Sequence, residues 1–102
     1  MSPNNNYRAG RRFEYQRRLF YKKSGYEDVV RTAGSHGSFD LLCFNSDRPV
    51  LAVQCKRVET MAEARRLLQR FKESPPYLAN EFFTQVMDVY VKKDREIVSV
   101  EI

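Results

Sequence analysis

An aspartate and a Gln-x-Lys pair occur in two successive apolar runs of the sequence. Asp40 begins the first run, and Gln54 and Lys56 lie two residues apart in the second. Side chains alternate between the faces of a strand, so Gln54 and Lys56 point to one side. Burying a lysine and an amide is costly unless charged partners or a metal ion meet them, and Asp40 is the expected partner. Together these side chains have the chemistry of a metal site that cuts phosphodiesters, although Lys56 and Asp40 could also form a purely structural salt bridge.

A single glutamate, Glu14, stands in a strongly basic segment near the N-terminus. Residues 8–23 contain seven lysines and arginines and no other acid. Glu14 could pair with Arg17 and Arg18, which follow it by three and four residues on a helix, and each pair is worth about 0.2–0.5 kcal/mol. Alternatively, Glu14 points towards Asp40 and completes an oxygen-ligand shell for Mg²⁺ or Mn²⁺. The sequence leaves both interpretations open.

Apolar periodicity and turn signals predict seven elements in the order α-β-β-β-α-β-β. The expected elements are helices over residues 11–23 and 61–72 and strands over residues 28–32, 39–44, 50–56, 85–91 and 97–102. Gly25 is a stop signal for the first helix, and Thr60 with Glu63 forms a capping box for the second. The first three strands are expected to form an antiparallel meander, which places Asp40 beside the Gln-x-Lys pair.

Composition indicates one globular domain with a polyanionic partner. Of the 102 residues, 42% are hydrophobic and 30% are charged, with a net charge of +5. Residues 1–6 are expected to be a flexible tail and residues 7–102 a single domain. No apolar run approaches the ~20 residues of a membrane span, so we expect no membrane partner and a cytoplasmic location, at the nucleoid or, for a viral protein, in the host cytoplasm. Two cysteines and one histidine do not make a zinc site, so both cysteines are expected to be small buried apolar residues.

Aromatic residues are interleaved with the arginines of the N-terminal segment, a pattern typical of a helix that packs on one side and meets phosphates on the other. A basic helix can also be merely solvated. Arg31 could contact phosphate or form a salt bridge on its strand, and His36 lies in a Gly/Ser-rich turn that could touch DNA. The expected DNA contacts are Arg8, Arg11, Arg12, Arg17, Arg31, His36 and Arg57.

Several motifs follow one another between residues 7 and 57. They are Tyr7-Arg8-Ala9-Gly10, Phe13-Glu14, Gly25-Tyr26, Val29-Val30-Arg31-Thr32-Ala33-Gly34-Ser35, Asp40 and Val53-Gln54-Cys55-Lys56. In this order they resemble the PD-(D/E)XK nuclease superfamily, and most of all the archaeal-type Holliday junction resolvases. The resemblance implies an α/β fold with a restriction-endonuclease-like core, in which helices flank a mixed central β-sheet. Ser35 matches a family serine next to the site and would bind phosphate, or it is an ordinary turn hydroxyl.

The resemblance also implies a Mg²⁺ site, with Mn²⁺ as a second possible ion, and a role for each residue of the group. Asp40 would be the central metal ligand, supported by Glu14, and Lys56 would orient or help deprotonate the attacking water. Gln54 would be a weaker third ligand. It is the residue at which this sequence departs from the family pattern, because these resolvases usually have glutamate there. The related Mrr-like restriction group has a Gln-x-Lys-Arg sequence, which resembles the segment from Gln54 to Arg57.

The expected activity is that of a metal-dependent, structure-selective endodeoxyribonuclease that resolves four-way DNA junctions by paired symmetric phosphodiester hydrolysis. Two incisions need two sites, so a homodimer on branched DNA is expected. Apolar residues after the second helix would form its interface or close the ordinary core: Tyr77, Leu78, Phe82 and Phe83. Two alternatives stay open, namely an Mrr-like or repair endonuclease on duplex or branched DNA, and a non-catalytic DNA-binding protein on the nuclease fold.

Overall fold

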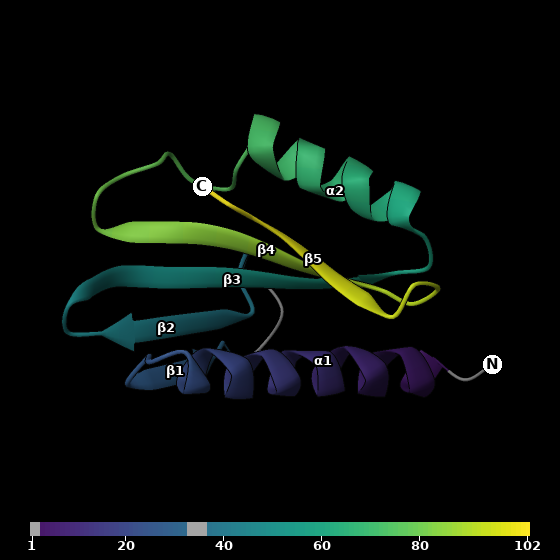
Figure 1. Ribbon diagram of the computed structural model, residues 1–102, viewed down its shortest axis with the longest axis horizontal. Helices are drawn as coiled ribbons and strands as arrows, with labels where there is room; N and C mark the ends of the chain where they lie inside the picture. Colours follow the sequence, from purple (N-terminus) through teal and green to yellow (C-terminus); the bar gives the residue numbers. More distant parts are fainter. Residues whose placement is uncertain (1–2, 33–36) are drawn as a thin grey trace.

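The computed structural model describes residues 3–32 and 37–102, which form helices and strands in the predicted order (Figure 1). The helices are α1 (Pro3–Lys23) and α2 (Met61–Glu73). The strands are β1 (Asp28–Arg31), β2 (Leu41–Asn45), β3 (Arg48–Val58), β4 (Phe83–Val91) and β5 (Glu96–Glu101). The order α-β-β-β-α-β-β is therefore confirmed, and each strand overlaps the range predicted for it.

All five strands belong to one sheet with the order β1-β2-β3-β4-β5. β1, β2 and β3 form the predicted antiparallel meander. β3 and β4 run parallel, because α2 carries the chain back along the sheet between them, and β5 returns antiparallel to β4. The protein therefore has a mixed sheet and belongs to the α/β class, as predicted.

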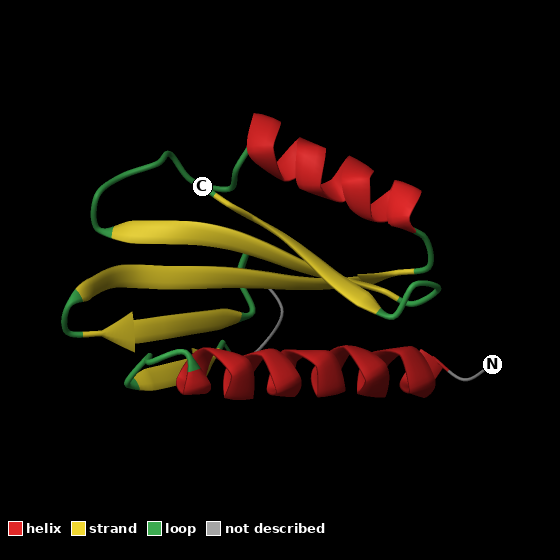
Figure 2. Cartoon of the chain, viewed as in Figure 1, coloured by secondary structure: helices red, strands yellow, loops and turns green. Residues whose placement is uncertain are grey.

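The two helices cover opposite faces of this sheet. Consecutive residues of β3 show the alternation, since Val53 is buried in a core with Tyr21 of α1, whereas Ala52 is buried in a second core with Ala64 and Phe71 of α2. We call these two sides the α1 face and the α2 face. Figure 2 shows the helices (red) on either side of the strands (yellow). Each face of the sheet can therefore present a different set of side chains.

α1 begins earlier than predicted. It starts at Pro3 rather than near residue 11, so the predicted start of the first helix is wrong. Proline is favoured at the first helical position, where its missing N–H is not needed, and asparagine is only mildly unfavourable in a helix. The other end agrees with the predicted stop signal. Gly25 has a φ of 105°, in the left-handed region that glycine adopts past a helix end.

The start of α2 is fixed by the predicted capping box. Thr60 Oγ1 accepts the backbone N–H of Glu63 at 3.3 Å, and the Thr60 hydroxyl donates to Glu63 Oε1 at 3.1 Å. The Glu63 carboxylate thus accepts a hydrogen bond from the Thr60 hydroxyl rather than from the backbone N–H of Thr60. This cap places the first turn of α2 close to the end of β3.

Both cysteines are free. Cys43 is fully buried in the α1-face core, as predicted, and burial raises its pKa to about 12. Cys55 is half-buried and packs against the same core. In the part of the chain that the structure describes, neither helix combines the length and the apolar character that crossing a membrane requires.

Candidate active site

β3 is longer than its neighbour β2, and this overhang creates the candidate site. β2 begins at Leu41, opposite Val53, whereas β3 continues to Val58. No described strand pairs with the edge of β3 beyond Val53 on that side. Asp40 occupies this edge, because its Oδ2 accepts the N–H of Cys55 at 2.7 Å and its own N–H donates to the Val53 carbonyl at 2.8 Å. Asp40 therefore lies against the Gln-x-Lys segment, where the sequence places it.

Glu14 does not pair with its neighbours along α1. Arg17 and Arg18 make their hydrogen bonds to the sheet instead. Glu14 Oε1 accepts from Arg31 Nε at 2.9 Å, so the interpretation of Glu14 as a member of ion pairs along the helix surface is wrong. Glu14 and Lys56 both line a cavity of about 450 Å³ between α1, the end of β3 and the start of α2. The glutamate thus faces the same space as the lysine.

Three side chains and one backbone N–H act on the Asp40 carboxyl. Burial raises its pKa above the ordinary value, and the negative charge of Glu14 raises it further. The N–H of Cys55 lowers the pKa, as do the charges of Lys56 and Arg31, but the net shift is upward. Groups from α1, β1 and β3 therefore meet at one half-buried carboxylate. A cation bound between two such carboxylates would relieve this unfavourable electrostatic environment.

Gln54 and Lys56 lie on the same side of β3, as the alternation predicts. In the parallel pair they stand opposite Met87 and Val89, which belong to the α2-face core. Lys56 is exposed and Gln54 is half-buried. Among the side chains of residues 8–32 and 37–102 and the described backbone, none is hydrogen-bonded to the Gln54 amide, so its oxygen can accept a ligand.

The expected metal ligands are two carboxylates, Glu14 and Asp40, and the amide of Gln54. Among the described residues, no group of three or more His, Cys, Asp and Glu side chains could hold a metal ion. Mg²⁺ usually keeps several waters and is bound through one or two carboxylates together with substrate phosphates. Glu14 and Asp40, which act on one another, are of the number and kind that this mode of binding uses, since water and phosphate would complete the shell.

Arginines lie beside Glu14 on the α1 side. Glu14 also lines a second cavity, of about 400 Å³, which we call the arginine cavity. The predicted DNA contacts that line it are Arg8, Arg11, Arg12 and Arg31. Arg18 lines it as well and was not among the predicted contacts, whereas Arg57 lines the larger cavity beside Lys56. Ser35 and His36 lie outside the described residues.

Arg17 is placed differently from the expectation of a DNA contact. Its side chain is 11% exposed, and its Nε donates to Asp88 at 2.9 Å. Asp88 is fully buried in β4 and also accepts the hydroxyl groups of Tyr21 at 2.7 Å and Ser99 at 2.6 Å. We call these four residues the Asp88 cluster. Because a buried guanidinium paired with a carboxylate has little surface left for phosphate, Arg17 is not part of the arginine cavity.

The Asp88 cluster has one signal in the sequence. Asp88 interrupts the apolar strand from Val86 to Val91, where an acid is costly without partners. Its partners lie between 11 and 71 residues away along the chain, so local spacing does not reveal them. Burial, helped by the Asp88 charge, raises the pKa of the Tyr21 phenol, which therefore stays a donor. Since Arg17 follows Glu14 by one helical turn, the cluster fixes the rotation of α1 and the direction of Glu14.

Comparisons with known proteins do not assign the chain to a family. No protein-family model matches it, and no curated protein matches it either. A functional inference therefore depends on the geometry and charge of the site itself.

Proposed function

We propose that the protein is a Mg²⁺-dependent, structure-selective endodeoxyribonuclease that resolves four-way (Holliday) DNA junctions. The observation that carries this proposal is the half-buried carboxylate of Asp40, on which Glu14 and Lys56 act from two other elements. Two carboxylates and a lysine beside an arginine-lined cavity suit the hydrolysis of a phosphodiester. The junction as substrate comes from the resemblance of residues 7–57 to archaeal-type resolvases.

Each residue of the site would have a distinct role. Glu14, Asp40 and Gln54 would hold Mg²⁺, or Mn²⁺, which suits the same oxygen ligands. When bound, such an ion lowers the pKa of its water and polarises the phosphate. The bond from the Cys55 N–H fixes Asp40 against β3 and so fixes the position of the ligands. Lys56 lines the same cavity, where it would orient the attacking water and offset negative charge in the transition state.

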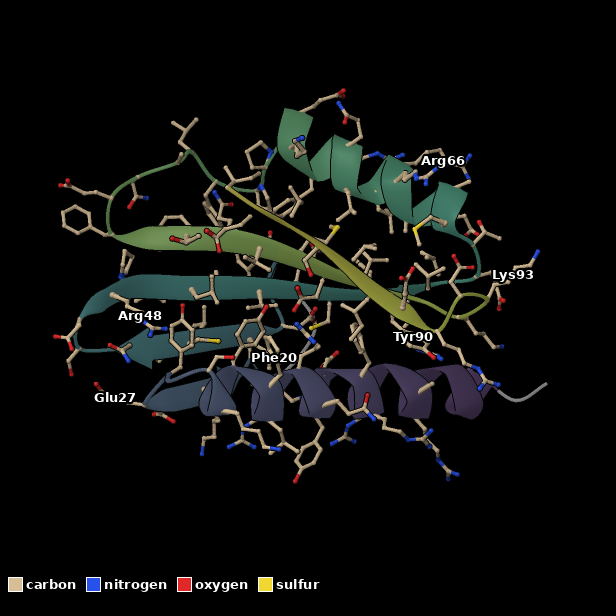
Figure 3. All side chains as sticks on the ribbon, in the orientation of Figure 1. Phe20, Glu27, Arg48, Arg66, Tyr90 and Lys93 are labelled. Atoms are coloured by element: carbon tan, nitrogen blue, oxygen red, sulfur yellow. The ribbon has the colours of Figure 1, made fainter. Side chains whose placement is uncertain are left out.

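The arginine cavity would bind DNA phosphates without reading base sequence. Each phosphate contact contributes about −0.9 to the slope of log affinity against log salt concentration. Arg8→Gln, in the cavity, should therefore make this slope less steep by about 0.9. Arg66→Gln is the matched control, because Arg66 projects from α2 on the side of the sheet away from α1 (Figure 3). A slope unchanged by Arg8→Gln would contradict this role.

A homodimer would supply the two sites needed for paired symmetric cuts. Three large apolar side chains are exposed between α2 and β4, namely Tyr77 (56%), Leu78 (88%) and Phe82 (74%), and such patches commonly mark interaction surfaces. Phe83, the fourth residue expected at this interface, begins β4 and packs partly buried against the α2-face core. We expect Leu78→Asp to convert a dimer into monomers in analytical ultracentrifugation. A wild-type monomer that still makes paired cuts would contradict the dimer.

The test of the proposed activity is cleavage of a labelled four-way junction, beside a matching linear duplex, in Mg²⁺ or Mn²⁺. Asp40→Asn removes the central ligand charge, and Asp47→Asn, at an exposed turn position between β2 and β3, is the matched control. We expect paired symmetric nicks in the junction alone. The rate should fall by at least about 10²-fold with Asp40→Asn and stay unchanged with Asp47→Asn.

Two other outcomes would replace the proposal. Equal cutting of the linear duplex would indicate a broader endonuclease of the Mrr-like or repair kind, which the Gln-x-Lys-Arg sequence favours. Tight junction binding without cutting would indicate a non-catalytic DNA-binding protein on this fold.

A further inference from the structure

We infer that a small hollow beside the candidate active site binds one unpaired nucleotide of the DNA substrate, an inference that rests on the proposed function. The hollow has a volume of about 170 Å³ and lies between α1 and the ends of β3 and β4. Its lining residues are Ala9, Arg12, Phe13, Gln16, Arg57 and Tyr90. Pockets that enclose drug-sized ligands measure about 300–1,000 Å³, so this one suits a single ring system with its phosphate at the rim.

Two stacked groups, which we call the platform, form the wall of the hollow on the sheet side. Arg57 and Tyr90 are partners in the register of β3 and β4. The guanidinium carbon of Arg57 lies 5.4 Å from the centre of the Tyr90 ring. Phe13 supports that ring from α1, with the two ring centres 5.8 Å apart. A base can stack on a guanidinium plane and an aromatic ring of this kind, whatever its identity.

Two guanidinium groups make the hollow positive. Arg12 and Arg57 both line it, and no acidic residue is among its described lining. Neither arginine forms an ion pair with residues 3–32 or 37–102. Gln16, one helical turn after Arg12, adds an amide that can both donate and accept. These groups match the parts of a nucleotide. The guanidinium groups can bind its phosphate, the platform can stack on its ring, and the amide can hydrogen-bond to the polar edge of the base.

The hollow adjoins the candidate active site. Phe13 and Arg57 line both the hollow and the cavity of about 450 Å³, and they are chain neighbours of Glu14 and Lys56. Arg12 connects the hollow to the arginine cavity, which it also lines. In a DNA strand bound across the candidate site, the nucleotide next to the reacting phosphate would lie on the platform. A base stacked in a duplex cannot reach such a platform, so the nucleotide must leave the stack and its pair, and the branch point of the substrate, where stacking is interrupted, is the place where it can do so.

Junctions with a single abasic site test this inference. Affinity is measured by fluorescence anisotropy with Ca²⁺ in place of Mg²⁺, and the abasic site is moved one position at a time across the junction centre. At one or two positions the wild type should bind about 5- to 100-fold more weakly, as expected for the loss of one base–aromatic stack. Tyr90→Leu should bind the intact junction more weakly by a similar factor and should not respond to the abasic site. Tyr90→Phe keeps the ring and should behave as the wild type.

Two further variants separate the platform from general effects on folding. Arg57→Lys keeps the positive charge at an exposed position but loses the planar group, so it should also lose sensitivity to the abasic site. The matched control is a chemically similar pair, Arg48 above the ring of Tyr26 at 5.1 Å. Arg48 and Tyr90 lie towards opposite ends of the sheet (Figure 3). Tyr26→Leu should therefore respond to the abasic site as the wild type does.

The inference is overturned if the wild type and Tyr90→Leu respond equally at every abasic position. A free nucleotide has the same chemistry as a nucleotide of the DNA strand, and dAMP tests whether the hollow binds one. If dAMP raises the melting temperature of the wild type but not of Tyr90→Leu, while junction affinity ignores Tyr90, the hollow binds a free nucleotide and the assignment to the DNA strand is wrong. Failure of the proposed activity is distinguishable from failure of this inference, because the abasic experiment measures binding and needs no cutting. A protein that never cuts the junction would contradict the proposed activity, yet it can still show the abasic effect that supports the inference.

Discussion

Two aspartates, Asp88 within the sheet and Asp40 at the edge of β3, are held in opposite ways. Asp88 is fully buried, and three side chains of its cluster donate hydrogen bonds to it. Asp40 is half-buried, and its carboxylate accepts the backbone N–H of Cys55. Its pKa is raised by burial and then by a second acid, Glu14. The comparison teaches that a carboxylate saturated by donors serves the fold, whereas one that is desolvated beside another acid keeps the capacity to bind a cation.

The largest effect should follow from removing the saturated aspartate. Asp88→Ala leaves the Arg17 guanidinium without its partner in the interior, and breaking a buried pair in this way costs about 3–5 kcal/mol. We expect this loss in the free energy of unfolding measured by urea denaturation. Asp47→Ala, at an exposed turn, should change it by less than about 0.5 kcal/mol.

A double variant shows whether the Asp88 cluster acts through charge pairing. Replacing Arg17 by Met and Asp88 by Leu together removes both buried charges, and such replacements are often neutral or stabilising. The double variant should therefore be more stable than Asp88→Ala alone. A loss below about 1 kcal/mol for Asp88→Ala would remove the distinction between the two aspartates.

The elements of the fold could be predicted because their signals are local. The capping box at Thr60 and Glu63, the stop at Gly25 and the alternation along β3 each depend on residues within one or two turns of one another. The start of α1 could not be predicted in this way, because residues 4–6 have weak preferences and Pro3 favours a helix start as readily as a loop.

The site could be predicted only in part, because its partners are distant in sequence. The closeness of Asp40 to Lys56 followed from two successive strands, which pair in a hairpin register. Glu14 and Arg31 are 17 residues apart, and Arg17 and Asp88 are 71 residues apart. Those pairs depend on how α1 rotates against the sheet, and the spacing of charges along α1 does not determine that rotation.

Metal binding should change the stability by a smaller amount than the loss of Asp88, and the change should depend on Asp40. A ligand that binds only the folded state stabilises it by about 2.7 kcal/mol at 100 times its dissociation constant. Mg²⁺ should therefore raise the melting temperature of the wild type and of Asp47→Asn, and leave Asp40→Asn unchanged. Equal shifts in the wild type and Asp40→Asn would show that the ion binds elsewhere.

Gln54→Glu should strengthen the binding of Mg²⁺ at the site and lower the stability of the metal-free protein. A third carboxylate adds negative charge beside Glu14 and Asp40, so the metal-free protein should be less stable, while Mg²⁺ should bind about tenfold more tightly, or by about 1.4 kcal/mol. Isothermal titration calorimetry measures this gain. The same substitution in the Asp40→Asn background is the control and should give little gain. Unchanged affinity for Mg²⁺ would place the side chain of residue 54 outside the metal shell.

The smallest effect should be on the pH dependence of stability. Because burial raises the pKa of Asp40 in the folded protein, the folded state binds the proton more tightly than the unfolded state does. The free energy of unfolding therefore loses the Asp40 contribution as the pH rises from the ordinary aspartate pKa through the raised value, and the loss is then constant. Asn cannot ionise but can still accept the Cys55 N–H, so without metal Asp40→Asn should gain stability relative to the wild type across that window.

Urea denaturation from about pH 4 to about pH 8 measures this difference, with Asp47→Asn as the control that stays parallel to the wild type. Added Mg²⁺ should reverse the advantage of Asp40→Asn, because only the wild-type carboxylate binds the ion. A stability difference that does not change with pH would mean that Asp40 ionises in the folded protein as freely as in the unfolded chain. In that case the contrast with Asp88 would lie in burial alone, and the overhang of β3 would hold Asp40 as an ordinary structural acceptor.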